Sequence, residues 1–373
     1  MRTKQEFGLV KRKVNSKIVY YYWVRDEGGI RRYRSTGEKT KAKAQEYVLS
    51  RRDEGSLQEL DVSGVLLKDY TKDFYIDGKC PVMANMKARG KAMAKSTANN
   101  YRKVLDKYIL PALGKYPINK LSSPIINRWL IKLPDNCNVK MSMANAAKKV
   151  LSNVMQQAVR DGLVKNNPCR DVENLGNDSE RHNAFTLDEV RRIIGTAEDW
   201  EVHPDIRVMC MVGATTGMRI AEVLSLRPVD VQQDRINVEH SYNTFDKLKS
   251  TKTKKDRTVP IPTKVYEEIS TYFPKNPEAF IFSTDGTKPY TQSTVGKYLK
   301  ARCQDFGIKD KTFHSFRAFV NTRLEEANIN ETIIQSVIGH SGAEMTKHYL
   351  HLEAGEFETV RNAQDEILNG IIA

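Results

Sequence analysis

Cysteines are scarce in this chain, and their spacing forms no framework. The five residues, Cys80, Cys137, Cys169, Cys210 and Cys303, are odd in number, widely scattered and free of any Cys-x-x-Cys pair. A disulfide scaffold or a cysteine zinc site is therefore not expected. A reducing compartment fits this pattern.

Several other features are also missing. No apolar run approaches the roughly 18 residues of a membrane span, and the first residues lead into no apolar signal core, so a cytoplasmic protein without a membrane partner is expected. The sequence contains neither a GxxxxGK[ST] phosphate loop nor the acidic cluster of a two-metal nuclease. We expect no cofactor and no metal.

Basic charge is what the chain has in excess. Lys and Arg number 60 against 46 for Asp and Glu, a formal net charge of +14 that favours a polyanionic partner, nucleic acid first. A length of 373 residues exceeds one ordinary core and predicts two or three domains.

The first sixty residues carry half of this net charge, with 15 basic and 8 acidic side chains. Aromatic and β-branched runs at 7–14, 17–25 and 30–35 predict three strands, followed by a helix at about 40–52. Such a sheet fits a DNA major groove. The basic residues expected to contact DNA are Lys11, Arg12, Lys13, Arg31, Arg32 and Arg34.

Helical periodicity takes over after a linker at 61–64. A helix is expected from Ser96, as N-cap, to a stop at Pro111, with further helices at about 124–132 and 142–161. The stretch 74–94 is irregular and gives no structural prediction beyond a mobile loop. Farther along, helices are expected at 206–214 and 221–226 and strands at 235–242 and 257–261.

Six polar residues in this last part stand in recognisable local contexts: Arg219, Lys252, His314, Arg317, His340 and Tyr349. Singly, none is informative, because such residues are usually surface, capping or core residues. Together, four stretches resemble the successive signature boxes of the tyrosine recombinases: 215–226, 314–317, 338–341 and 346–349. The stretch 251–261 is similar to the family's β-hairpin that carries a lysine.

The resemblance implies a cofactor-free DNA strand-cleaving enzyme. Tyr349 would be the nucleophile, although a phenol with a pKa of about 10 needs cationic neighbours. Two arginines, Arg219 and Arg317, would bind the scissile phosphate bidentately, and Lys252 would protonate the leaving 5′ oxygen. His314 and His340 would bond the phosphate or accept the tyrosine proton, and the sequence does not say which does which. Glu222, one helical turn after Arg219, would hold the cations.

The resemblance extends over nearly the whole chain. It predicts an α+β multidomain protein, with an arm-type DNA-binding sheet and helix at 1–60, a helical core-binding domain at 65–175, a mainly α catalytic domain with a small sheet at 178–358, and a C-terminal tail at 359–373 that docks on its own domain or on a neighbour. The expected function is integration or excision of a mobile element, by a homotetramer on double-stranded attachment-site DNA with accessory DNA-bending or excision factors. The alternatives are an Xer-like resolvase, a type IB topoisomerase and a binding-only regulator.

Overall fold

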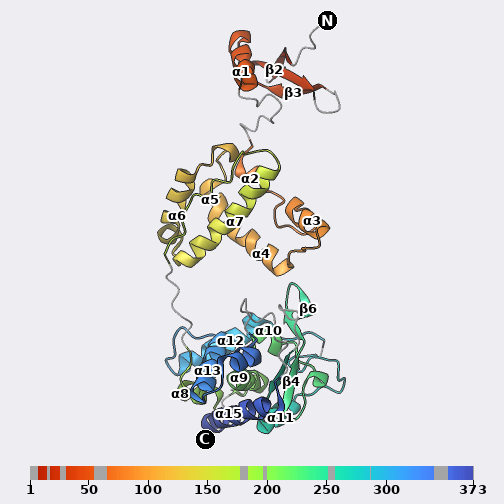
Figure 1. Cartoon of the computed structure of the whole chain (residues 1–373), viewed down its shortest axis with the longest axis vertical. Coiled ribbons are helices and arrows are strands. Elements are labelled where there is room, and N and C mark those ends of the chain that lie inside the picture. Colours follow the sequence, from red (N-terminus) through yellow and green to blue (C-terminus); the bar gives the residue numbers. More distant parts are fainter. Residues whose placement is uncertain are drawn as a thin grey trace. The chain divides into compact units, whose positions relative to one another are not determined.

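A computed structural model of the chain describes residues 7–14, 17–25, 31–53, 65–176, 184–195, 200–250, 257–285, 287–339 and 352–372. The chain divides into two units, Met1–Ser179 and Glu180–Ala373. Helices dominate both units, and the strands form small separate sheets (Figure 1). The predicted α+β class is thus confirmed. Among the helices of the described ranges, none has the length and apolarity that crossing a bilayer requires.

The N-terminal strands form the expected antiparallel sheet. Strands β1 (Phe7–Val14), β2 (Lys17–Arg25) and β3 (Arg31–Ser35) pair in the order β1-β2-β3, and helix α1 (Lys41–Asp53) follows. Tyr22 and Val24 point from β2 into a small core with Val48 of α1. Because side chains alternate along a strand, this burial defines one face of the sheet as the helix-covered face.

The rest of the first unit is a helical bundle with its own core. It consists of α2 (Leu67–Tyr70), α3 (Pro81–Ala88), α4 (Lys95–Val104), the π-helix η1 (Leu105–Ile109), α5 (Leu110–Leu113), the 3₁₀ helix η2 (Ile118–Lys120), α6 (Ser123–Cys137) and α7 (Met141–Arg160). The α7 bounds match the prediction closely. Its apolar stripe, which includes Leu151 and Met155, is fully buried in the bundle core.

One expectation for this bundle was wrong, and one stretch without a firm prediction is now assigned. The stretch 74–94 contains helix α3, and Pro81 stands in its first turn, where a missing N–H costs nothing. The helix expected to start at Ser96 and stop at Pro111 starts at Lys95, after Ala94 as N-cap, and continues through Pro111 into α5. The π-helix η1 ends two residues before Pro111, and the wider turn of a π-helix gives room for a proline ring and its missing donor.

The second unit surrounds a buried helix, α9 (Pro204–Thr216), in which every residue from Ile206 onward is buried. Its other helices are α8 (Leu187–Ile194), α10 (Ile220–Val223), the 3₁₀ helix η4 (Pro228–Asp230), α11 (Thr263–Ser270), α12 (Gln292–Asp305), α13 (Phe313–Glu326), α14 (Glu331–Ile338) and α15 (Ala354–Ile372). Helix α15 contains most of the amphipathic tail and packs on its own unit, against α8, α9 and α13.

The strand expected at 235–242 is interrupted at Glu239. It forms β4 (Arg235–Val238), which pairs with β7 (Arg257–Pro260), and β5 (His240–Asn243), which pairs with β6 (Lys247–Ser250). Strand β7 therefore returns beside β4 and brings Arg257 into the second unit's interior, where that residue is buried.

Close packing between α9 and α13 generates a stability prediction. A Cβ atom added at Gly213 would lie 2.7 Å from the Phe313 ring, so Gly213→Ala forces the two helices apart. We expect the free energy of unfolding to fall by about 1–3 kcal/mol, because overpacking outweighs the gain in helix propensity.

Gly296→Ala on the exposed face of α12 is the matched control, because nothing lies within 4 Å of its added Cβ. It should raise stability by roughly 0.5–1 kcal/mol. Urea unfolding followed by Trp200 fluorescence, with Trp23 and Trp129 replaced by Phe, restricts the signal to the second unit. Equal effects of the two alanines would contradict the packing argument.

Candidate active site

The first signature box, residues 215–226, folds as the end of helix α9 followed by the short helix α10. Helix α9 ends at Gly217, whose φ of 64° is the left-handed conformation that glycine adopts at helix C-termini. Arg219 follows as N-cap of α10, and its backbone N–H donates to the Glu222 carboxylate at 2.9 Å. The side chain of Arg219 is thereby placed at the N-terminus of α10.

Glu222 is the anionic centre of the site. One carboxylate oxygen accepts from Nη1 of Arg219 at 2.9 Å and from Nη1 of Arg257 at 3.2 Å. The other accepts from Nη2 of Arg257 at 2.7 Å and from the Arg219 backbone. Glu222 is only 3% exposed. Burial alone would raise the pKa of its carboxyl, but the charge and hydrogen bonds of Arg257, aided by those of Arg219, outweigh burial and hold this pKa below its ordinary value.

Three guanidinium groups bind three consecutive carbonyl oxygens at the C-terminal end of α14. Nε of Arg257 donates to Val337 O at 2.9 Å, Nη1 of Arg317 donates to Ile338 O, and Nη2 of Arg219 donates to Gly339 O at 2.7 Å. Carbonyls at a helix C-terminus lack intrahelical partners and carry partial negative charge, which favours cations. We call Arg219, Arg257, Arg317 and Glu222 the arginine cluster.

The buried guanidinium of Arg317 is only partly satisfied. Nη1 also donates to Gly217 O at 2.9 Å, whereas Nε and Nη2 are buried without a hydrogen-bond partner in the described part of the chain. Burial, followed by the positive charges of Arg219 and Arg257, lowers the pKa of Arg317 to about 9, although Glu222 opposes the shift. Three cations share one carboxylate, so an anion would relieve both the unmade hydrogen bonds and the charge imbalance.

The other predicted catalytic residues are close in the sequence to members of this cluster or to the residues that it binds. His314 lies in the first turn of α13, one turn before Arg317, and its side chain is exposed. Lys252, His340 and Tyr349 lie outside the described residues. Lys252 falls between the end of β6 and the start of β7, and His340 directly follows Gly339, which the cluster binds.

Arg257 is the member of the cluster that sequence reasoning missed. It lies within the stretch 251–261, in which the predicted catalytic residue is Lys252. Its signal is its place three residues before Pro260 at the start of a short apolar strand, because a charged residue entering a buried strand needs a buried partner.

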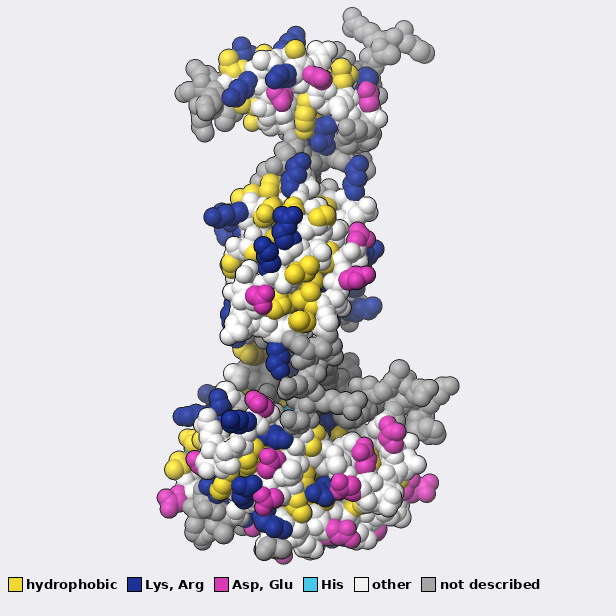
Figure 2. Space-filling view, turned by 90° about the vertical axis from the view of Figure 1, so that its left-hand side faces the viewer, with side chains coloured by type: hydrophobic (Ala, Val, Ile, Leu, Met, Phe, Trp, Pro, Cys, Tyr) yellow, Lys and Arg dark blue, Asp and Glu magenta, His cyan; other side chains and the backbone are white. Residues whose placement is uncertain are grey.

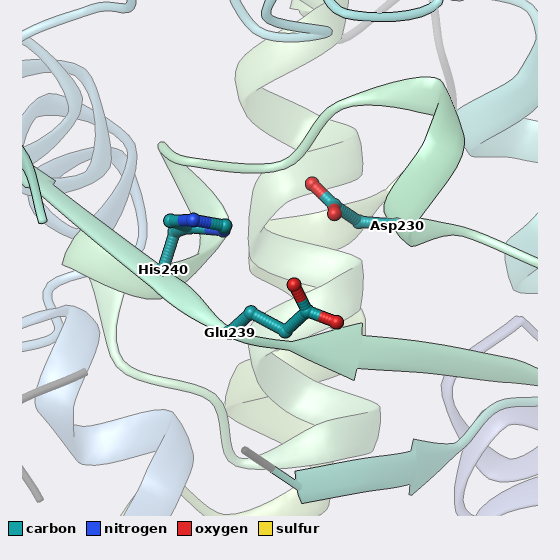
Figure 3. Close-up of side chains that lie close together, drawn as sticks. All are labelled: Asp230, Glu239 and His240. Carbon is teal, nitrogen blue, oxygen red and sulfur yellow. The ribbon is translucent and has the colours of Figure 1, made fainter. Parts of the chain in front are cut away.

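A second group of side chains joins β4 and β5 to η4. Asp230, Glu239 and His240 bring possible metal-ligand atoms within 4.8 Å of one another (Figure 3). Asp230 is already bound by Arg227, whose Nε and Nη2 donate to its two oxygens at 3.1 Å each. Glu239 is exposed. The observed bonds thus explain Asp230 as part of the cap of η4.

The N-terminal sheet divides the predicted DNA contacts between its faces. Lys11 shares the alternation of Phe7 and Leu9, and Arg34 is paired with Tyr22, so both belong to the helix-covered face. Arg12 and Arg31 belong to the opposite, open face. The side chains of Lys13 and Arg32 are outside the described part.

The arginines of this open face stack on aromatic rings. The Arg12 guanidinium lies 4.9 Å from the Tyr21 ring centroid and 4.8 Å from that of Tyr33, and Arg31 lies 4.3 Å from that of Trp23. Figure 2 shows basic and hydrophobic side chains side by side over this segment. The indole of Trp23 lies across Gly8, where an added Cβ would meet it at 2.6 Å. Such stacking holds each guanidinium in place while its N–H edge stays available.

Comparison with known proteins gives the class of this fold. Residues 183–356 match the profile described as "Phage integrase family", and residues 82–175 match "Phage integrase central domain". The integrase of Mycobacterium phage L5 is 22% identical over 82% of this chain and 80% of its own length, and a tyrosine recombinase of Thermosipho africanus is 29% identical over 54% and 68%.

A solved structure shares the fold over a larger part of the chain. The lambda integrase tetramer bound to a Holliday junction aligns with a TM-score of 0.59 at 19% identity, covering 92% of this chain and 98% of that one. With both family models and these relatives in agreement, the chain belongs to the tyrosine recombinase family.

The Glu222 geometry makes a pH-dependent prediction. Glu222→Gln leaves two buried or half-buried guanidinium groups without their anion and should lower stability at pH 7 by about 3–5 kcal/mol. Because the folded pKa of Glu222 is depressed, its contribution is present above the ordinary carboxyl range and is lost as pH falls through the folded value. The difference between wild type and variant should therefore shrink below about pH 4.

Glu278→Gln is the control, because Glu278 also binds an arginine, Arg227, but is 63% exposed. It should change stability by less than about 1 kcal/mol. Urea unfolding at several pH values measures both variants. A Glu222→Gln deficit that stays constant down to pH 3 would show that the carboxylate charge is not what stabilises the cluster.

Proposed function

We propose that the arginine cluster is the phosphate-binding centre of a site-specific DNA recombinase that integrates or excises a mobile element. The observation that carries this proposal is that Arg219 and Arg317 are each fixed by a backbone carbonyl of α14 while keeping further N–H donors. Rigidly held, charged donors of this kind stabilise the negative charge that develops at a phosphate under attack.

The proposed reaction needs no cofactor. The Tyr349 oxygen forms a bond to phosphorus while the bond from phosphorus to the 5′ oxygen breaks, which leaves a 3′-phosphotyrosine and a 5′ hydroxyl. The phenol proton passes to His314 or His340, and Lys252 protonates the leaving oxygen. A 5′ hydroxyl from a partner duplex reverses these steps and exchanges strands.

The partner is double-stranded DNA with paired attachment sites. The net charge of +14 supports a polyanionic partner. The assembly would be a homotetramer, as in the lambda integrase tetramer, with accessory DNA-bending or excision factors. The three-stranded sheet β1–β3 favours an integrase over an Xer-like resolvase, because the Xer type generally lacks an arm-binding sheet.

Tyr349→Phe tests the covalent step. The change removes the phenolic oxygen alone, so the protein should bind core-site DNA with nearly unchanged affinity but form no covalent complex. Incubation with labelled core-site duplex, followed by SDS electrophoresis, separates covalent from reversible complexes. An SDS-resistant complex formed by the variant would overturn the assignment of Tyr349.

Arg12→Ala tests the open face of the N-terminal sheet. Loss of one contact to DNA should weaken arm-site binding and, where that contact is a phosphate, should reduce the salt slope by about 0.9. Arg52→Ala is the matched control, since Arg52 is also exposed but lies on α1 and binds Asp53. Binding titrations across a range of salt concentrations compare the two. Equal effects would show that only the segment's overall charge matters.

A further inference from the structure

Arg257 differs from the other two arginines of the cluster in having all three guanidinium nitrogens bound inside the protein. Nε donates to Val337 O, and Nη1 and Nη2 donate to the two oxygens of Glu222. The side chain is 8% exposed, against 38% for Arg219. Because each of its nitrogens is already bound and its side chain is buried, the Arg257 guanidinium is far less open to a phosphate than that of Arg219.

We propose that Arg257 is a positioning residue for strand cleavage, which aims the Arg219 guanidinium by holding both of its anchors. This inference rests on the proposed function. The first anchor is Glu222, because a single carboxylate oxygen accepts from Nη1 of both arginines. Any movement of Arg257 that displaces this carboxylate therefore displaces Arg219.

The second anchor is the end of α14. Arg257 binds Val337 O, and Arg219 binds Gly339 O two residues later. Gly339 has a φ of 75°, and a Cβ added there would lie 3.0 Å from Cζ of Arg257, so the guanidinium packs directly against this turn. Gly339 belongs to the signature box 338–341, so Arg257 packs against the described start of that box.

Lysine cannot replace this arrangement. A guanidinium presents a planar set of donors that spans two carboxylate oxygens and a carbonyl at once, whereas an ammonium group is a point donor on a flexible stem. Arg257→Lys retains the buried charge but loses the fixed geometry. It therefore separates positioning from charge.

The matched control is Arg207→Lys in the same unit. Arg207 has a side chain 9% exposed and binds a carbonyl, Ile194 O at 3.1 Å, and a carboxylate, Glu268 at 3.1 Å. It lies near the start of α9, ten residues before Gly217, or roughly 15 Å along the helix. Arg207→Lys therefore measures the effect of replacing a comparable buried arginine that does not belong to the cluster.

The experiment measures how fast the covalent complex forms in a single turnover on two core-site duplexes. Their sequence is read from the joint between the element and its flanking DNA. One has an ordinary scissile phosphate, and the other has a methylphosphonate, in which a methyl group replaces one non-bridging oxygen and removes its charge. Less negative charge then develops for Arg219 to stabilise. Arg257→Lys should slow cleavage of the phosphate on the order of tenfold to a hundredfold, but cleavage of the methylphosphonate severalfold less.

A substitution that only loosens the fold would slow both substrates by the same factor, as Arg207→Lys should. Core-site affinity should stay within about twofold for both variants, because both side chains are bound inside the protein and affinity depends on many other phosphate contacts. In an Arg219→Ala background, Arg257→Lys should add almost nothing to the loss, because Arg257 acts through Arg219.

Three results would overturn the inference: equal slowing of the two substrates, additive losses with Arg219→Ala, or full activity of Arg257→Lys. If Arg257→Lys does not fold, Arg257→Gln removes the buried cation while Glu222 stays paired with Arg219, and it should show the same substrate-selective loss. A wild-type protein that forms no covalent complex with the phosphate duplex would instead overturn the proposed function.

Discussion

The second unit depends on one arrangement, in which the carbonyls at the C-terminal end of α14 are bound by arginines from three other segments. Arg219 comes from the start of α10, Arg257 from β7 and Arg317 from α13, and each donates to a different carbonyl in the run 337–339. The helix end supplies partial negative charge, and Glu222 supplies the only full negative charge of the cluster. Like-charged groups can be held together in this way without a metal ion.

The surrounding fold holds these three segments next to one another. Helix α9 is buried along nearly its whole length and ends at Gly217, whose carbonyl also accepts from Arg317. Helix α13 packs so closely on α9 that the ring of Phe313 fills the space left at Gly213. Residues about a hundred positions apart in sequence therefore meet with little freedom to adjust, which is what a preorganised site requires.

The sequence predicted those parts that local pattern determines. Strands β1 and β2 and helix α7 were placed accurately because aromatic alternation and an apolar helical stripe are local signals. Val14 pairs with Lys17, and this register places Arg12 on the face of Tyr21. Alternation along the strands could therefore have divided the basic residues between the two faces correctly. The role of Arg257 was not predictable, because its partners lie 35 and 80 positions away. The helix continues through Pro111 by way of a π turn, which the general expectation that proline ends a helix does not include.

The cluster also explains why binding and chemistry should be separable in this protein. DNA affinity accumulates over many exposed lysines and arginines, so each contributes a small share. Arg317, in contrast, is 3% exposed, and its buried Nε and Nη2 have no hydrogen-bond partner in the described ranges. A donor of that kind is costly in the absence of an anion and strongly stabilised by one, most of all when the anion gains charge. If the cluster binds the scissile phosphate as proposed, the cost of burying Arg317 with unmade hydrogen bonds is offset where that phosphate is attacked. Specificity for the transition state would then come from the two anchored arginines and not from the basic surface.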